Sequence, residues 1–96
     1  MTPTDYDLRL EVLASIPPAG FARVKVLADD FGVTMDEVTQ AAVSLATEYG
    51  VILLPSLDGN GKLMLPKDAQ ACLRIRGECQ DYWQRVYGQE PPASRN

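Results

Sequence analysis

Apolar residues recur at helical spacing in four segments of this chain, and two short apolar runs lie between the third and fourth segments. The first segment predicts a helix from Thr4, a favourable N-cap residue, to about Ile16, where a Pro-Pro pair follows. The second segment predicts a helix over residues 22–31. We therefore expect two consecutive helices in the first third of the chain.

The third segment begins with a capping box, in which the side chains of Thr34 and Glu37 satisfy free amides at a helix start. This helix is expected to run to about Tyr49, before a glycine. The apolar runs at residues 51–54 and 62–65 predict two strands, joined by a tight Asp-Gly-Asn-Gly turn. The sequence therefore predicts a β-hairpin after three helices.

The fourth segment predicts a helix from Pro66 to about Tyr87 with a heptad-like apolar stripe, which is typical of a helix packed along another helix. The residues of this stripe, with the neighbouring tryptophan, are Cys72, Ile75, Cys79, Tyr82, Trp83 and Val86. They either fold back onto the first helix or pair with a second copy of the chain, and both alternatives remain open. The expected organisation is a domain over residues 1–66, a C-terminal packing or dimerisation helix over 67–88, and a flexible tail over 89–96.

The second helix, the third helix and the start of the hairpin resemble those of winged helix-turn-helix transcription regulators of the PadR, MarR and GntR kinds. The residues that carry the resemblance are Leu27-Ala28, Phe31-Gly32-Val33, Val38, Leu45 and Tyr49-Gly50-Val51-Ile52. The resemblance implies a mostly α fold with a small β-hairpin, the wing, followed by a C-terminal helix. PadR-like regulators often pair two subunits through such a helix, so the resemblance also implies a homodimer.

The resemblance further implies a DNA-binding transcription regulator that occupies an operator. The compact single-domain size suggests a phage, plasmid or bacterial operon as its source. The third helix would enter the major groove of double-stranded DNA. The candidate contacts on this helix are Thr34, Met35, Asp36, Thr39 and Gln40. The candidate phosphate contacts are Arg23, Lys25 and Lys62, and three such contacts give a salt slope of about −2.7.

The distribution of charge favours a second interpretation. The net charge is −4, and residues 1–50 hold eight acidic side chains against three basic ones. Basic side chains supply much of the affinity for DNA, yet the predicted DNA-reading helix has no Lys or Arg. The alternative is a protein-interaction module without DNA binding, whose acidic face docks a basic or DNA-binding partner. The residues of this acidic face are Asp29, Asp30, Asp36, Glu37 and Glu48.

Other chemistry is sparse in this sequence. The chain has no histidine, no nucleophile elbow and no phosphate-binding glycine loop, so we expect neither an enzyme nor a cofactor. Cys72 and Cys79 would lie about 10 Å apart along a helix, too far for a disulfide, and two cysteines alone make a poor metal site. No apolar run approaches the roughly 20 residues that span a bilayer, so no membrane partner and a cytoplasmic location are expected.

Overall fold

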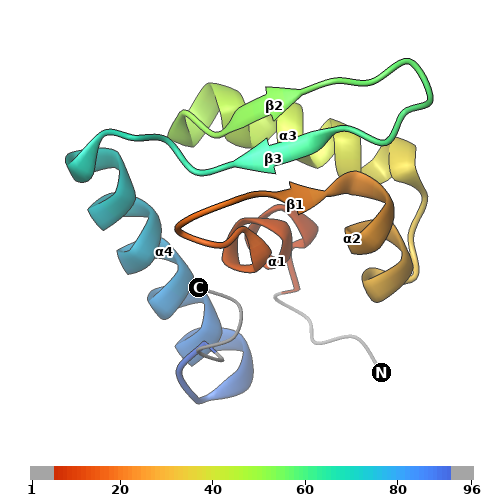
Figure 1. The fold of residues 1–96 in the computed structure, drawn as a ribbon. Helices are drawn as coiled ribbons and strands as arrows, with labels where there is room; N and C mark the ends of the chain where they lie inside the picture. The colour runs from red at the N-terminus through yellow and green to blue at the C-terminus, as the bar shows by residue number, and fades with distance from the viewer. Residues whose placement is uncertain (1–5, 92–96) are drawn as a thin grey trace.

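The computed structural model describes residues 6–91 of the chain. These residues form four helices and one three-stranded antiparallel sheet, with strand order β1-β3-β2 (Figure 1). The elements in chain order are α1 (Leu8–Ser15), β1 (Ala22–Arg23), α2 (Val24–Phe31), α3 (Met35–Tyr49), β2 (Ile52–Leu54), β3 (Lys62–Met64) and α4 (Ala69–Tyr87). The prediction of a mostly helical fold with a small β element is confirmed. No helix in the described range is long and apolar enough to cross a membrane.

The prediction of a helix over residues 22–31 is wrong at its first two residues, which form β1. β1 pairs with β3, and β2 pairs with the other edge of β3, so the predicted two-stranded hairpin is part of a three-stranded sheet. The backbone N–H of Val24 also donates to the carbonyl of Gly61, at 3.0 Å. The chain is extended here because a distant strand supplies its hydrogen-bond partners, which local propensity does not reveal.

Two helices begin later than the sequence predicts, because an aspartate caps each of them. The carboxylate of Asp7 accepts a hydrogen bond from the backbone N–H of Arg9 at 3.0 Å, and α1 follows it. The predicted start at Thr4 lies outside the described residues. The carboxylate of Asp68 accepts from the backbone N–H of Ala71 at 3.0 Å, so α4 begins after it rather than at the Pro-Lys pair before it.

The turn between α2 and α3 has the local structure that the sequence predicts. Gly32 ends α2 with φ of 66°, a left-handed conformation that glycine adopts at little cost. The hydroxyl of Thr34 accepts from the backbone N–H of Glu37 at 3.1 Å, and the Glu37 carboxylate accepts from the backbone N–H of Thr34 at 3.2 Å. The predicted capping box is therefore confirmed, and it sets where α3 begins.

The hydrophobic core lies between the first three helices and the central strand β3. Leu63 is the inward residue of β3 and is fully buried, while its neighbours Lys62 and Met64 point to the opposite face of the sheet. The other fully buried apolar residues from these elements include Val12, Leu13, Val24, Val38 and Leu45. One face of the sheet therefore packs against the hydrophobic core, and the opposite face lies outside it.

Helix α4 lies against α1 and α3 of the same chain (Figure 1). Of the predicted stripe, Ile75, Cys79, Tyr82 and Trp83 are buried, and Cys72 and Val86 are half-buried. The structure places these side chains in the core of the single chain, which is the first of the two alternatives. The homodimer remains a prediction, and its interface needs other residues because most of this stripe is already buried.

A buried carboxylate joins α1 to α4. Glu11 is 3% exposed and accepts hydrogen bonds from the hydroxyl groups of Tyr82 at 2.9 Å and Tyr87 at 2.5 Å. The Tyr82 oxygen in turn accepts from the backbone N–H of Asp7 at 3.0 Å. A buried charge of this kind is tolerated because hydrogen bonds replace its hydration. The network therefore fixes α4 on the fold through groups that the apolar pattern did not reveal.

Candidate nucleic-acid interface

The outer face of α3 is exposed to solvent. Asp36, Gln40, Val43 and Thr47 are exposed and follow one another at helical spacing, and Glu37 and Glu48 beside them are exposed as well. Of the other predicted DNA contacts, Thr34 is exposed and Thr39 is half-buried. Half-buried Met35 faces the wing loop (residues 55–61), since a Cβ at Gly59 would lie 3.8 Å from its methyl carbon. The start of α3 and the wing loop are therefore neighbours on one side of the molecule.

All of the charged side chains of α3 are acidic. Glu37 belongs to the capping box, and the Glu48 carboxylate lies 2.8 Å from the guanidinium of Arg9. Arg9 also pairs with Asp7 at 3.2 Å, and its pKa is raised first by the hydrogen bond to Asp7 and then by the charge of Asp7. The arginine that approaches α3 from α1 is thus already shared between two carboxylates. The outer face of α3 therefore presents negative charge to any ligand.

Hydrogen bonds from its own side chains hold the wing loop against the start of α2. The Asp58 carboxylate accepts from the Ser56 hydroxyl at 2.7 Å and from the backbone N–H of Asn60 at 2.9 Å, and these bonds lower the pKa of Asp58. The side-chain oxygen of Asn60 then accepts from the backbone N–H of Lys25 at 3.0 Å. Wing and α2 therefore form one continuous surface, and Asn60 positions it.

Arg23 and Lys62 lie opposite each other in the β1–β3 register, and both contact the ring of Phe21. The guanidinium carbon of Arg23 is 5.2 Å from the ring centroid, and the Lys62 ammonium is 4.6 Å from it. Phe21 is 44% exposed. Neither cation forms an ion pair within residues 6–91. We call Phe21, Arg23 and Lys62 the Phe21 cluster.

The register places the Phe21 cluster on the outer face of the sheet, opposite buried Leu63. Arg23, Lys62 and Leu54 occupy one row across the three strands, and Met64 and Ile52 occupy the next row. Leu54 is exposed, and Met64 and Ile52 are half-buried. We call the set Phe21, Arg23, Ile52, Leu54, Lys62 and Met64 the outer sheet face. It combines two cations with apolar side chains, a different chemistry from that of the acidic α3.

Lys25, the third predicted phosphate contact, lies apart from the Phe21 cluster. It is exposed in the first turn of α2, and its ammonium is 3.5 Å from the carboxylate of Asp29. Both side chains are well exposed, so this pair contributes little to stability and opens readily. Lys25 therefore remains available to a phosphate at small cost.

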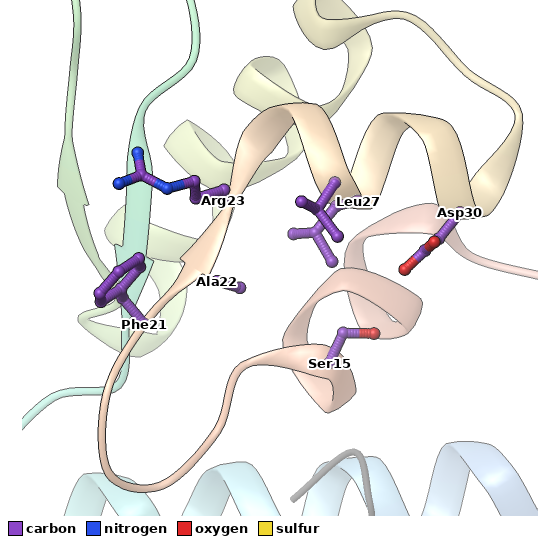
Figure 2. Close-up of a pocket in the computed structure, with 7 residues that line it drawn as sticks. Ser15, Phe21, Ala22, Arg23, Leu27 and Asp30 are labelled. Carbon is purple, nitrogen blue, oxygen red and sulfur yellow. The ribbon is translucent and has the colours of Figure 1, made fainter.

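A pocket of about 410 Å³ lies on the other side of β1 (Figure 2). It is lined by Ser15, Phe21, Ala22, Arg23, Val26, Leu27 and Asp30. Figure 2 shows the side chains of Phe21 and Arg23 turned towards the sheet, while Ser15 and Asp30 lie across the pocket from them. The lining is therefore mixed, with a hydroxyl and a carboxylate across the pocket from an aromatic ring and a cation.

The five residues predicted as an acidic docking face have different environments. Asp29, Glu37 and Glu48 are engaged with Lys25, the capping box and Arg9 respectively. Asp30 at the end of α2 and Asp36 at the start of α3 are both exposed. They flank the turn between the two helices. All five residues are exposed, and of these only Asp30 and Asp36 have no salt bridge or capping hydrogen bond among the described residues.

Sequence reasoning identified the cations of this interface and missed its aromatic residue. Phe21 lies just before the helix predicted over residues 22–31 and belongs to no predicted element, so its place on a sheet face does not follow from the sequence. Exposure alternates over Phe21, Ala22 and Arg23 in the structure, but the residue types read apolar, apolar and polar, so the sequence has no strand pattern here. A strand of two residues is too short to predict from periodicity.

Within residues 6–91, no group of three or more acidic, cysteine or histidine side chains converges as a metal site would require. Cys72 and Cys79 are both free, and burial raises the pKa of Cys79 to about 11. Comparisons of the chain with protein-family models, with curated proteins and with solved structures gave no match.

Proposed function

We propose that this chain is a winged-helix regulator that binds double-stranded DNA and acts by occupying its site. The element order supports the fold assignment: a helix, a strand, two helices joined by a tight turn, and a hairpin whose second strand lies at the centre of the sheet. In this arrangement α2 and α3 are the helix-turn-helix, and the loop between β2 and β3 is the wing.

The observation that carries the proposal is the pair Arg23 and Lys62. Like charges directly opposite on neighbouring strands destabilise a sheet. In the described part of the chain neither cation forms an ion pair, and the Asp58 carboxylate of the wing loop acts on Arg23 only as a more distant charge. A bound phosphate removes this repulsion, because it lies between two positive groups that are already held together. Without a ligand, the repulsion between the two cations lowers the stability of the sheet. Binding of a polyanion would explain why both cations are present at these positions.

Lys25 extends this positive edge towards α3. Its backbone N–H donates to Asn60 of the wing loop, and its ammonium group lies 3.5 Å from the Asp29 carboxylate on α2. With Arg23 and Lys62 it provides three phosphate contacts, for which we expect a salt slope of about −2.7. Three contacts supply little electrostatic affinity, so we expect weak binding that is best measured at low salt.

The outer face of α3 supplies base contacts in this proposal. Gln40 and Thr39 have the hydrogen-bonding groups for base edges, and Val43 offers an apolar surface to a thymine methyl. Asp36 repels nearby phosphate and accepts only from a donor such as the cytosine amino group. The acidic charge of α3 therefore contributes discrimination between sequences rather than general affinity.

The test is selection of bound duplexes from a randomised library at low salt with the purified full chain. We expect an enriched sequence motif with the wild type, and loss of retention with the double variant Arg23→Gln/Lys62→Gln. The matched control is Lys67→Gln/Arg76→Gln, which removes the same charge from exposed positions elsewhere. Retention of no duplex by the wild type would overturn the proposal.

A second candidate function is supported by the exposed pair Asp30 and Asp36. They flank the turn between α2 and α3, and Val43, 53% exposed, lies on the outer face of α3. An exposed apolar residue near acidic ones suits a basic protein partner. Titration of a lysine-rich peptide against the wild type and Asp30→Asn/Asp36→Asn tests this function. Equal affinities of the two proteins for the peptide would rule it out.

A further inference from the structure

The outer sheet face exposes an aromatic and an apolar side chain, which binding of fully paired DNA does not explain. Phe21 is 44% exposed and Leu54 is 48% exposed, and both share this face with Arg23 and Lys62. The backbone of a DNA duplex presents phosphates and sugars, while its bases are stacked inside. The two cations therefore match the duplex surface, but the aromatic ring and the apolar row do not.

Unpaired bases have the complementary chemistry. A nucleic-acid strand with exposed bases offers flat apolar surfaces that stack on aromatic side chains, and phosphates on the same strand that meet cations. Resting on the proposed function, we propose that the Phe21 cluster binds an unpaired segment of DNA adjacent to the duplex. A base stacks on Phe21, and Arg23 and Lys62 contact the flanking phosphates.

The geometry of the cluster supports this assignment. Arg23 and Lys62 are cross-strand neighbours, so their Cβ atoms lie about 5 Å apart and both side chains emerge beside the ring. The ring is held by contacts to both cations at 5.2 Å and 4.6 Å, which limits its motion before any ligand arrives. A pre-positioned ring loses little side-chain freedom when a base stacks on it.

The acidic face of α3 also favours a ligand that is not confined to the major groove. Asp36 and Glu37 lie in the first turn of α3, the part of a recognition helix that approaches closest to DNA. Their repulsion of phosphates limits how deeply α3 enters the groove of a duplex. An unpaired strand can leave the duplex and follow the outer sheet face, away from these carboxylates.

An acidic apolar peptide is the other ligand with matching charge, and a test can separate the two. The DNA probes are a blunt duplex and the same duplex with a tail of about eight unpaired thymines, a length within the range that single-strand sites cover. Their affinities are measured by fluorescence anisotropy at low salt with the full chain. We expect the tailed duplex to bind about tenfold more tightly than the blunt one.

The decisive variant is Phe21→Leu, which keeps apolar bulk and removes the aromatic face. We expect the ratio of tailed to blunt affinity to fall to about one in this variant, and to be retained in Phe21→Trp. The matched control is Leu73→Ala, an exposed apolar residue of α4 that we expect to leave the ratio unchanged. An unchanged ratio in Phe21→Leu would overturn the inference.

The probes also separate this inference from the proposed function. Equal binding of tailed and blunt duplexes by the wild type would overturn the inference and leave duplex binding intact. Binding of an eight-thymine strand without binding of the blunt duplex would support the inference and refute the proposed duplex function. A third result would assign the outer sheet face to a protein partner and overturn the inference. In this result the wild type binds neither the blunt nor the tailed duplex, but binds a glutamate- and leucine-rich peptide tightly, and Phe21→Leu does not bind the peptide.

Discussion

Arg23 and Lys62 face each other across the pairing of β1 with β3, and neither forms an ion pair in the part of the chain described here. Two like charges at directly opposed positions of a sheet reduce its stability by a few tenths of a kcal/mol or more. The two cations therefore lower the stability of the sheet, while in the proposed function they raise its affinity for DNA. Stability and affinity should therefore respond in different ways to one substitution.

Lys62→Glu is the substitution that exposes this difference. It converts a repulsive pair into an attractive one, worth about 0.2–1 kcal/mol, while the contact of Lys62 with Phe21 is lost. We expect the free energy of unfolding to stay within about 0.5 kcal/mol of wild type or to rise, and the affinity for duplex DNA to fall. Urea denaturation and anisotropy measure the two quantities. Destabilisation well beyond this range would mean that Lys62 has a structural role.

Gly61 and Gly77 make a matched pair for the packing of the wing. A Cβ at Gly61 would lie 2.7 Å from the backbone oxygen of Leu54, whereas a Cβ at Gly77 in α4 meets nothing within 4 Å. We expect Gly61→Ala to destabilise the protein by about 1–3 kcal/mol because backbone has to move. Gly77→Ala should stabilise it by about 0.5–1 kcal/mol because alanine favours a helix interior.

Urea denaturation of both glycine variants tests the close approach of Gly61 to the end of β2. If Gly61→Ala were as stable as wild type, the close approach of Gly61 to Leu54 would be incorrect. Gly77→Ala shows in the same experiment that an added methyl group is not harmful in itself.

Tyr82 and Tyr87, which bond to Glu11, make the free energy of unfolding depend on pH in the alkaline range. Burial, followed by the interaction with Glu11, raises the pKa of Tyr87 from 10.0 to about 12, and burial also raises the pKa of Tyr82. A raised pKa means that the folded state favours the protonated hydroxyl. The protonated hydroxyl of Tyr87 therefore contributes its full stabilisation below pH 10.0, and this contribution is lost as the pH rises towards 12.

Thermal unfolding of the wild type and Tyr87→Phe over this alkaline range tests the linkage. We expect the melting temperature of the wild type to fall as the pH rises above 10.0, and to fall less steeply in Tyr87→Phe, which has one ionisable hydroxyl fewer. Identical pH dependence of the two proteins would show that Tyr87 does not titrate with unfolding.

Local signals predicted α2, α3 and the turn between them well. The capping box of Thr34 and Glu37 and the glycines at positions 32 and 50 determine helix ends through hydrogen bonds between near neighbours. Such features are readable from sequence because each depends on only a few consecutive residues. The hairpin turn is predicted less well: its hydrogen bond joins Gly59 to Ser56, two residues before the predicted Asp-Gly-Asn-Gly turn.

The structural features that could not be predicted from the sequence depend on contacts between residues far apart in the chain. β1 exists because Ala22 and Arg23 meet a strand forty residues further along the chain, and the two residues alone have no strand signature. Without β1, the approach of Arg23 to Lys62 and the exposure of Phe21 were not predictable. Burial of Glu11 likewise depends on Tyr82 and Tyr87, at the far end of the chain. The stripe on α4 was ambiguous because packing within a chain and between chains selects the same apolar spacing.

The most direct test of the proposed interface is the salt dependence of duplex binding by wild type and Arg23→Gln/Lys62→Gln, with Lys67→Gln/Arg76→Gln as the charge-matched control. Each phosphate contact contributes about 0.9 to the slope of log affinity against log salt concentration. We predict that the cluster variant loses about 1.8 from the slope, and that the control keeps the wild-type slope. Equal slopes for all three proteins, or equal losses in both variants, would contradict the assignment of Arg23 and Lys62 as the phosphate-binding residues.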